Sequence, residues 1–216
     1  MKIFDISRTL SDETPPWPGD TQFRFNLNWK MAEGASVNVG ALTMSGHSGT
    51  HADAPFHFNP SGASIDVVSL DIYFGQAVVV DLTKPFANDC DRARRISVED
   101  LASVASMLER APRLLLKTNV WKDPNVFPDW VPVIEPDVPA WLGKRGVKLL
   151  GVDVPSVDPI EAKELANHHA LAAAGIMIVE SLNLSDVAPG VYHFAALPLK
   201  IANGDAAPVR AILWRD

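Results

Sequence analysis

The sequence has a single cysteine, no long hydrophobic run and no extended basic cluster. One cysteine, Cys90, excludes an intramolecular disulfide framework, and we interpret it as incidental rather than catalytic. No apolar run approaches the about 20 residues that a membrane-spanning helix needs, and the first residues, MKIFDIS, lack the apolar core of a signal peptide. We therefore expect a cytoplasmic protein without a membrane partner.

Positive charge is also scarce, with 19 lysine and arginine residues against 26 acidic residues and a net charge of −7. The densest basic stretch, at positions 92–95, is short and has acidic neighbours. A nucleic-acid surface needs clustered lysine and arginine, so we expect no nucleic-acid partner. The hydrophobic fraction of 47% over 216 residues is typical of a globular protein with a real core.

The predicted elements alternate between strands and helices. Strands are expected at residues 2–10, 23–29, 37–44, 76–83, 114–117, 147–154, 176–180, 191–201 and 208–214. One helix begins after Ser97, which with Asp100 forms a capping-box pattern, and further helices are expected at 140–144 and 160–174. This order predicts an α/β fold with a mixed β-sheet, and the absence of a linker-like stretch predicts a single domain over 1–216.

Residues 47–57 hold three of the six histidines and one aspartate: His47, His51, Asp53 and His57. Imidazole nitrogens together with a carboxylate suit a divalent cation such as zinc, with manganese as an alternative. Two glycines and a proline in the segment make a helix unfavourable. In an extended chain the four side chains share one side, but the ends would lie about 33 Å apart. The chain must therefore bend so that these groups converge, which predicts a metal site rather than a loop of capping histidines.

A second group of candidate ligands consists of His168, His169 and Glu180. Both histidines flank the apolar stripe of the expected helix at 160–174, and periodicity alone does not select the ligand. Glu180 ends an apolar run, where a buried carboxylate is unfavourable unless it binds a metal or pairs with an arginine. Capping and turn roles are sufficient for Asp153 and Asp158.

The segment from His47 to His57 resembles the H-x-G-T-H-x-D-x-P-x-H signature of the cyclase-like metal-dependent hydrolases, and within them the bacterial kynurenine formamidases (arylformamidases). The likeness continues at positions 4–7, 17–20, 151–156, 196–200 and 208–211. The stretch 121–141, rich in tryptophan and proline, is the main departure from the family pattern. It could alter access to the substrate site.

The resemblance implies a swivelling β/β/α-type domain that forms homodimers and carries two divalent metal ions, usually Zn²⁺. By motif matching, His47, His51 and Asp53 would hold the first ion, Asp53 would bridge to the second, and Glu180 would touch both. The family's remaining ligand is a histidine twelve residues before that glutamate, which selects His168 over His169.

The resemblance also assigns His57 as the acid/base residue and Trp17 as the aromatic residue that packs on the substrate ring. Flanking prolines stiffen the loop of Trp17, although this tryptophan could instead anchor the loop to the core. The implied reaction is hydrolysis of a small aryl formamide, N-formyl-L-kynurenine, to L-kynurenine and formate. Two alternatives stay open: a related hydrolase for another aryl or cyclic amide, and a non-catalytic metal-binding module. Structural zinc sites favour cysteine, which argues against the second.

Overall fold

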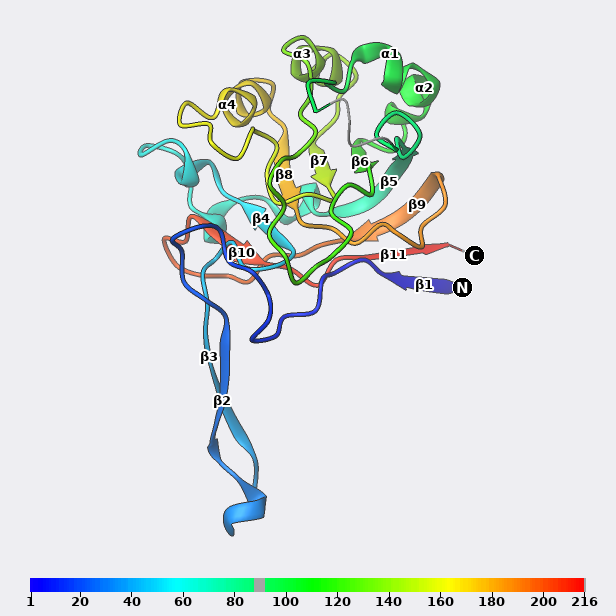
Figure 1. The fold of residues 1–216 in the computed structure, drawn as a ribbon. Helices are drawn as coiled ribbons and strands as arrows, with labels where there is room; N and C mark the ends of the chain where they lie inside the picture. The colour runs from blue at the N-terminus through cyan, green and yellow to red at the C-terminus, as the bar shows by residue number, and fades with distance from the viewer. Residues whose placement is uncertain (88–91, 216) are drawn as a thin grey trace.

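The structure is a computed structural model that describes residues 1–87 and 92–215, so Cys90 lies outside the described residues. Its main feature is a nine-stranded mixed sheet with the order β1-β11-β9-β5-β6-β7-β8-β4-β10 (Figure 1). The strands are β1 (Lys2–Asp5), β4 (His51–Asp53), β5 (Phe74–Asp81), β6 (Arg113–Lys117), β7 (Leu149–Val152), β8 (Met177–Glu180), β9 (Gly190–Ala195), β10 (Ala206–Pro208) and β11 (Ile212–Arg215). The predicted α/β fold with a mixed sheet is confirmed.

The four central strands, β5 to β8, are parallel, and antiparallel strands extend the sheet on both sides. The helices are α1 (Val98–Leu101), α2 (Ala105–Leu108), α3 (Val138–Gly143) and α4 (Ala166–Ala173), and they cover one face of the parallel strands (Figure 1). Short 3-10 turns lie at Met31–Glu33, Pro55–His57, Ile65–Val67, Leu70–Ile72 and Ala102–Val104. None of the helices in the described part of the chain is long and apolar enough to cross a membrane.

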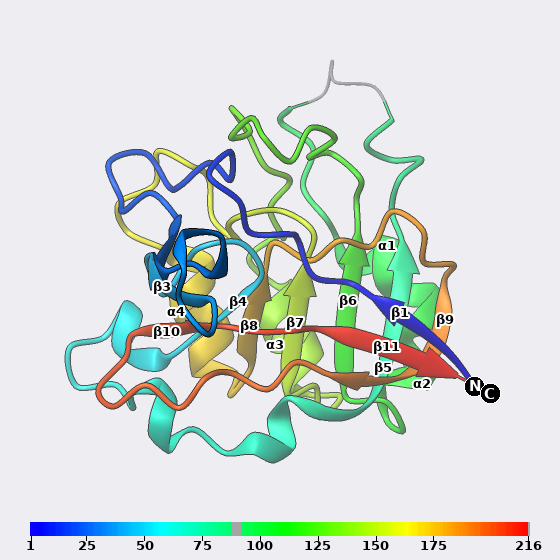
Figure 2. The same ribbon diagram turned by 90° about the horizontal axis from the view of Figure 1, so that it is seen from below.

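The sheet curls so strongly that its two ends approach each other. Strand β10 ends the sheet on one side, whereas β11 is next to the strand at the other end. Only residues 209–211 join these two strands, and so short a link spans no more than about 14 Å. In Figure 2 the two strands follow one another along a single path across the parallel strands.

Alternation along the strands divides the apolar side chains between two cores. Val78 and Val80 of β5 belong to the core between the sheet and the helices. Ala77 and Val79 belong to a second core enclosed by the curled sheet. Because both faces are covered, the central strands are continuous apolar runs, as parallel strands usually are.

Strands β2 (Arg24–Trp29) and β3 (Val39–Thr43) form a separate antiparallel hairpin, which we call the arm. The arm projects away from the rest of the molecule (Figure 1), and every residue of both strands is exposed. Along the sequence, the arm follows the loop of Trp17 and precedes His47, so both of its ends are connected to segments of the predicted site.

Several boundaries differ from the sequence prediction. The Ser97–Asp100 capping box is confirmed, but the helix expected over 160–174 covers only Ala166–Ala173. The carboxylate of Asp158 accepts the backbone N–H groups of Asn167 and His168, which fixes the first turn there. The strands expected at 2–10 and 191–201 end earlier, at residues 5 and 195.

Candidate metal centre and substrate pocket

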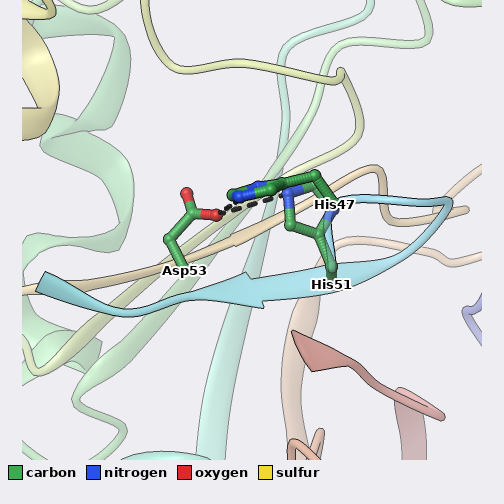
Figure 3. A group of neighbouring side chains, drawn as sticks. All are labelled: His47, His51 and Asp53. Carbon is green, nitrogen blue, oxygen red and sulfur yellow. Dashed lines mark ion pairs between the residues drawn. The ribbon is translucent and has the colours of Figure 1, made fainter. Parts of the chain in front are cut away.

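Three elements bring the predicted ligands together. His51 and Asp53 lie on β4, and His51 is directly opposite Glu180 of the neighbouring strand β8. His168 comes from α4, which covers this end of the sheet, and His47 lies in the turn before β4. Figure 3 shows the side chains of His47 and His51 directed toward the Asp53 carboxylate.

The ligand atoms lie close enough to share metal ions. Asp53 Oδ1 is 3.2 Å from His47 Nδ1 and 3.3 Å from His51 Nε2. Two ligands at about 2.1 Å from a tetrahedral zinc ion are themselves about 3.4 Å apart. The observed separations therefore fit atoms that surround one cation.

Both carboxylates have a second oxygen directed toward His168. His168 Nε2 lies 3.5 Å from Asp53 Oδ2 and 3.7 Å from Glu180 Oε1. The other Glu180 oxygen, Oε2, lies 3.5 Å from His51 Nε2. Asp53 and Glu180 thus lie between a histidine pair on one side and His168 on the other.

Buried polar atoms in the cluster lack ordinary hydrogen-bond partners. His51 Nε2 and both oxygens of Asp53 are buried without a hydrogen bond in the described part of the chain. Such atoms are unfavourable unless a ligand satisfies them. The residues present therefore fit a divalent cation, and no arginine of the described residues pairs with Glu180, which removes the salt-bridge alternative.

The far side of each imidazole is held by a second group. His51 Nδ1 donates to Gly49 O at 2.9 Å, and His168 Nδ1 donates to Asp158 Oδ2 at 2.7 Å. Each bond leaves Nε2 directed at the carboxylates, and such outer partners orient metal-binding histidines. The backbone at Gly49 has a φ of +62°, and an added Cβ there would lie 2.6 Å from Leu10. A residue with a side chain would be strained at this backbone conformation, so glycine is favoured here.

Without a metal, protons balance the charge of the cluster. Burial by itself lowers the pKa of His51, but the Asp53 and Glu180 carboxylates outweigh this effect and raise the pKa to about 10. For His168, burial is likewise outweighed by Asp158 and the cluster carboxylates, and its pKa is about 10. Metal binding must therefore displace protons from these imidazoles.

His57 lies at the edge of this cluster rather than inside it. Its ring centroid is 4.2 Å from that of His47, and 30% of its side chain is exposed. Burial lowers its pKa, so the imidazole is neutral near pH 7 and available to accept a proton.

Sequence reasoning missed Asp205, in the turn before β10. Asp205 Oδ2 accepts a hydrogen bond from His47 Nε2 at 3.0 Å and lies 3.8 Å from His57 Nδ1. The sequence around it, Asn203-Gly204-Asp205, indicates only a turn. The role of Asp158 as a partner of His168 was missed for the same reason, because capping explains that residue equally well.

A pocket of about 500 Å³ opens above the cluster. Trp17 lines it and contacts Phe127 edge to face, with ring centroids 5.3 Å apart. Trp121 also lines it, so the unmatched stretch 121–141 supplies two aromatic walls of the pocket. His169, in contrast, is exposed and contacts Phe58 outside the cluster.

Comparisons with known proteins agree over nearly the whole chain. A family model described as "Putative cyclase" matches residues 4–159. The kynurenine formamidase of Geobacillus thermodenitrificans is 44% identical over 209 residues, which cover 97% of this chain and 95% of that protein. The kynurenine formamidase of Bacillus cereus (strain ZK / E33L) is 42% identical with the same coverage.

Two solved structures share the fold. One, described as a potential metal-dependent hydrolase with cyclase activity, has a TM-score of 0.80 and 27% identity, covering 98% of this chain and 96% of that chain. The other, isatin hydrolase A from Labrenzia aggregata bound to benzyl benzoate, has a TM-score of 0.82 and 26% identity, with coverage of 98% and 93%.

Proposed function

The chain belongs to the cyclase family, and from this membership we propose that it is a metal-dependent kynurenine formamidase that hydrolyses N-formyl-L-kynurenine to L-kynurenine and formate. The observation that carries the proposal is the buried cluster of three histidines and two carboxylates beneath an aromatic pocket. The cluster provides the ligands of a hydrolytic metal site, and the aromatic walls suit an aryl substrate.

The arrangement fits two divalent ions per chain. We propose that both are Zn²⁺, with Mn²⁺ as the alternative. His47, His51 and Asp53 would hold one ion, while His168 would hold the other. Asp53 and Glu180 would contact both, because each has one oxygen directed to either side. Elemental analysis of metal-supplemented protein would give close to two ions per chain; full activity with one ion would contradict this.

Bound divalent cations supply Lewis acidity, which lowers the pKa of water and polarises the formyl carbonyl group. His57 accepts a proton from the attacking water and donates it to the aryl amine nitrogen as the C–N bond breaks. Trp17 and Phe127 pack on the aromatic ring and hold the formamide group over the cluster. No serine or cysteine nucleophile takes part.

The direct test is incubation of metal-loaded protein with N-formyl-L-kynurenine and detection of both products, with chelator-treated protein as the control. A substrate panel separates the proposal from its rival. Because isatin hydrolase A shares the fold, a cyclic amide such as isatin belongs in that panel together with formanilide. Higher kcat/KM for isatin would assign the chain to the rival activity.

We further propose that the protein is a cytoplasmic homodimer of single-domain subunits with a swivelling β/β/α-type fold. An isolated two-stranded hairpin is marginally stable in water, which argues that something covers the arm. Large apolar side chains are exposed on it, among them Phe25, Trp29 and Leu42. A second copy of the chain would cover these side chains.

A further inference from the structure

A second cavity, of about 480 Å³, lies beside the catalytic pocket. Gly49 and Trp121 line both, so the two cavities adjoin each other at the loop between His47 and His51. None of the steps described above uses this second cavity. Its most unusual lining residue is Arg8, in the segment that follows β1.

The side chain of Arg8 is half-buried and held in place. It stacks on the ring of Trp121 at 3.8 Å from the centroid, and its Nη2 donates to the backbone oxygen of Asp153 at 3.0 Å. Its Nε is buried without a hydrogen-bond partner in the described part of the chain. Burial lowers the pKa of Arg8 to about 10, which still leaves it charged at neutral pH.

The carboxylate of Asp153 is occupied by other donors. It accepts the backbone N–H groups of Thr118 and Asn119 and the Thr118 hydroxyl. Among the described residues, the ion pairs formed by arginine side chains do not include Arg8. Charges shielded from water are normally paired closely, whereas the opposite charge of Asp153 acts on Arg8 only from beyond ion-pair distance, so the guanidinium group can still pair with a ligand anion.

The remaining lining of the cavity is suited to an anion. Lys122 adds a second positive charge, and Asn125, Asn183 and Ser11 add neutral hydrogen-bonding groups. Asp153 is the one acidic residue in the lining as described, and its carboxylate is already satisfied. A planar guanidinium group matches the two oxygens of a carboxylate.

We propose that this cavity is a carboxylate-binding site, in which Arg8 and Lys122 pair with the carboxylate group of a reaction component. The proposal rests on the proposed function, because that reaction offers two carboxylates beside the catalytic pocket. One is the amino-acid carboxylate of N-formyl-L-kynurenine, and the other is the released formate.

The first arm of the test measures binding of a free carboxylate by thermal denaturation of the metal-loaded protein. Sodium formate and sodium acetate should raise Tm by about 2–5 °C over sodium chloride at equal ionic strength. Lys122→Met and Arg8→Gln should remove most of that rise, and Arg8→Lys should restore part of it. Lys144 is exposed and lines neither cavity, so Lys144→Met should behave as wild type. Metal analysis of each variant excludes loss of ions as the cause.

The second arm measures the carboxylate of the substrate itself. Lys122→Met should raise KM about tenfold more for N-formyl-L-kynurenine than for formanilide, which has no carboxylate. Arg8→Gln should act in the same direction, and Lys144→Met should change neither KM. Because Arg8 packs on Trp121 and bonds to the backbone of Asp153, Arg8→Gln could disturb folding, and the exposed Lys122 keeps the test valid in that case.

If the Lys122 and Arg8 variants lose the Tm rise with carboxylates but keep the wild-type KM, the site binds free formate. If the variants raise KM for N-formyl-L-kynurenine more than for formanilide, the site binds the carboxylate of the substrate. If the Lys122 and Arg8 variants match wild type in both arms, the cavity is not a carboxylate site. Failure of the wild type to hydrolyse N-formyl-L-kynurenine would instead overturn the proposed function. The thermal measurements alone would then show whether the cavity binds a carboxylate.

Discussion

His57 is more exposed than its neighbouring histidines, and we propose that it is a catalytic residue whereas they are metal ligands. If His57 moves protons at the edge of the cluster, as proposed, His57→Ala should lower kcat about 10²–10⁴-fold with nearly unchanged metal content. His51→Ala should lose metal and activity together, since it removes a buried nitrogen between two carboxylates. Elemental analysis and kinetics of both variants give the comparison.

The opposite result for His57 has a clear structural interpretation. His47, His57 and Asp205 also place potential ligand atoms within 4.8 Å of one another. If His57→Ala lost metal as His51→Ala does, His57 would be a ligand within that group, and its assignment as the acid/base residue would be wrong.

Trp17 should determine preference for aromatic substrates. Its indole is 37% exposed and contacts Phe127 rather than the apolar core, so it is available to a ligand. An aromatic pair contributes about 0.5–1.5 kcal/mol beyond area burial, so Trp17→Ala should lower kcat/KM for N-formyl-L-kynurenine at least several-fold. Hydrolysis of a small aliphatic formamide, metal content and Tm should stay nearly constant. Equal losses on both substrates, or a large fall in Tm, would identify Trp17 as an anchor of its loop.

Among the secondary-structure elements, α4 positions the proposed metal ligand His168 through its first turn. Asp158 accepts two backbone N–H groups of that turn and the Nδ1–H of His168. We expect Asp158→Ala to destabilise the protein by at least about 1 kcal/mol and to weaken metal binding about 10–100-fold. Denaturant titration and competition with a chelator measure the two effects.

Ser97→Ala is the matched control, because it removes the cap of α1 away from the site. It should cost a similar amount of stability, about 1 kcal/mol, without changing metal affinity. Equal metal affinity in both variants would mean that Asp158 supports only the helix.

The arm is the element whose stability depends most on a partner. Leu42 is 63% exposed on the arm, and Leu70 is 55% exposed elsewhere on the molecule. If a second copy covers the arm, Leu42→Ser should raise the dissociation constant of the dimer at least about tenfold, whereas Leu70→Ser should leave it unchanged. Analytical ultracentrifugation measures both. A wild-type monomer at micromolar concentration would contradict the proposed homodimer.

For the molecule as a whole, the cluster links stability to pH. Without metal, the pKa values of His51 and His168 are about 10, above the value near 6.5 of an unfolded histidine. A raised pKa means that the folded state holds protons that the unfolded state releases, so the stabilisation is complete below about pH 6.5 and is lost toward pH 10. The Tm of metal-free protein should therefore fall as pH rises through this window.

Metal-loaded protein should show a much flatter Tm over the same range, because its imidazoles bind cations in place of protons. Thermal denaturation at several pH values, with and without chelator, makes the comparison. Parallel curves for the two forms would show that these histidines do not exchange protons for metal.

The sequence by itself determined the class of the fold, and it predicted the metal-binding chemistry that we propose for the site. A metal site could be predicted because residue types that bind cations rarely cluster within seven positions by chance, as His47, His51 and Asp53 do. The mixed sheet was predictable because short apolar runs alternate with amphipathic segments. Both properties are local, so a pattern along the chain records them.

Only the tertiary structure decided the relations between distant segments. Periodicity left His168 and His169 equivalent, and the packing of α4 against β8 buries the first and exposes the second. Asp205 meets His47 only because β10, from the far end of the chain, pairs with β4 and so places the turn before β10 beside the site. Arg8 likewise stacks on Trp121 only because the fold brings the segment after β1 against that ring. Such contacts depend on the path of the whole chain, which no local pattern encodes.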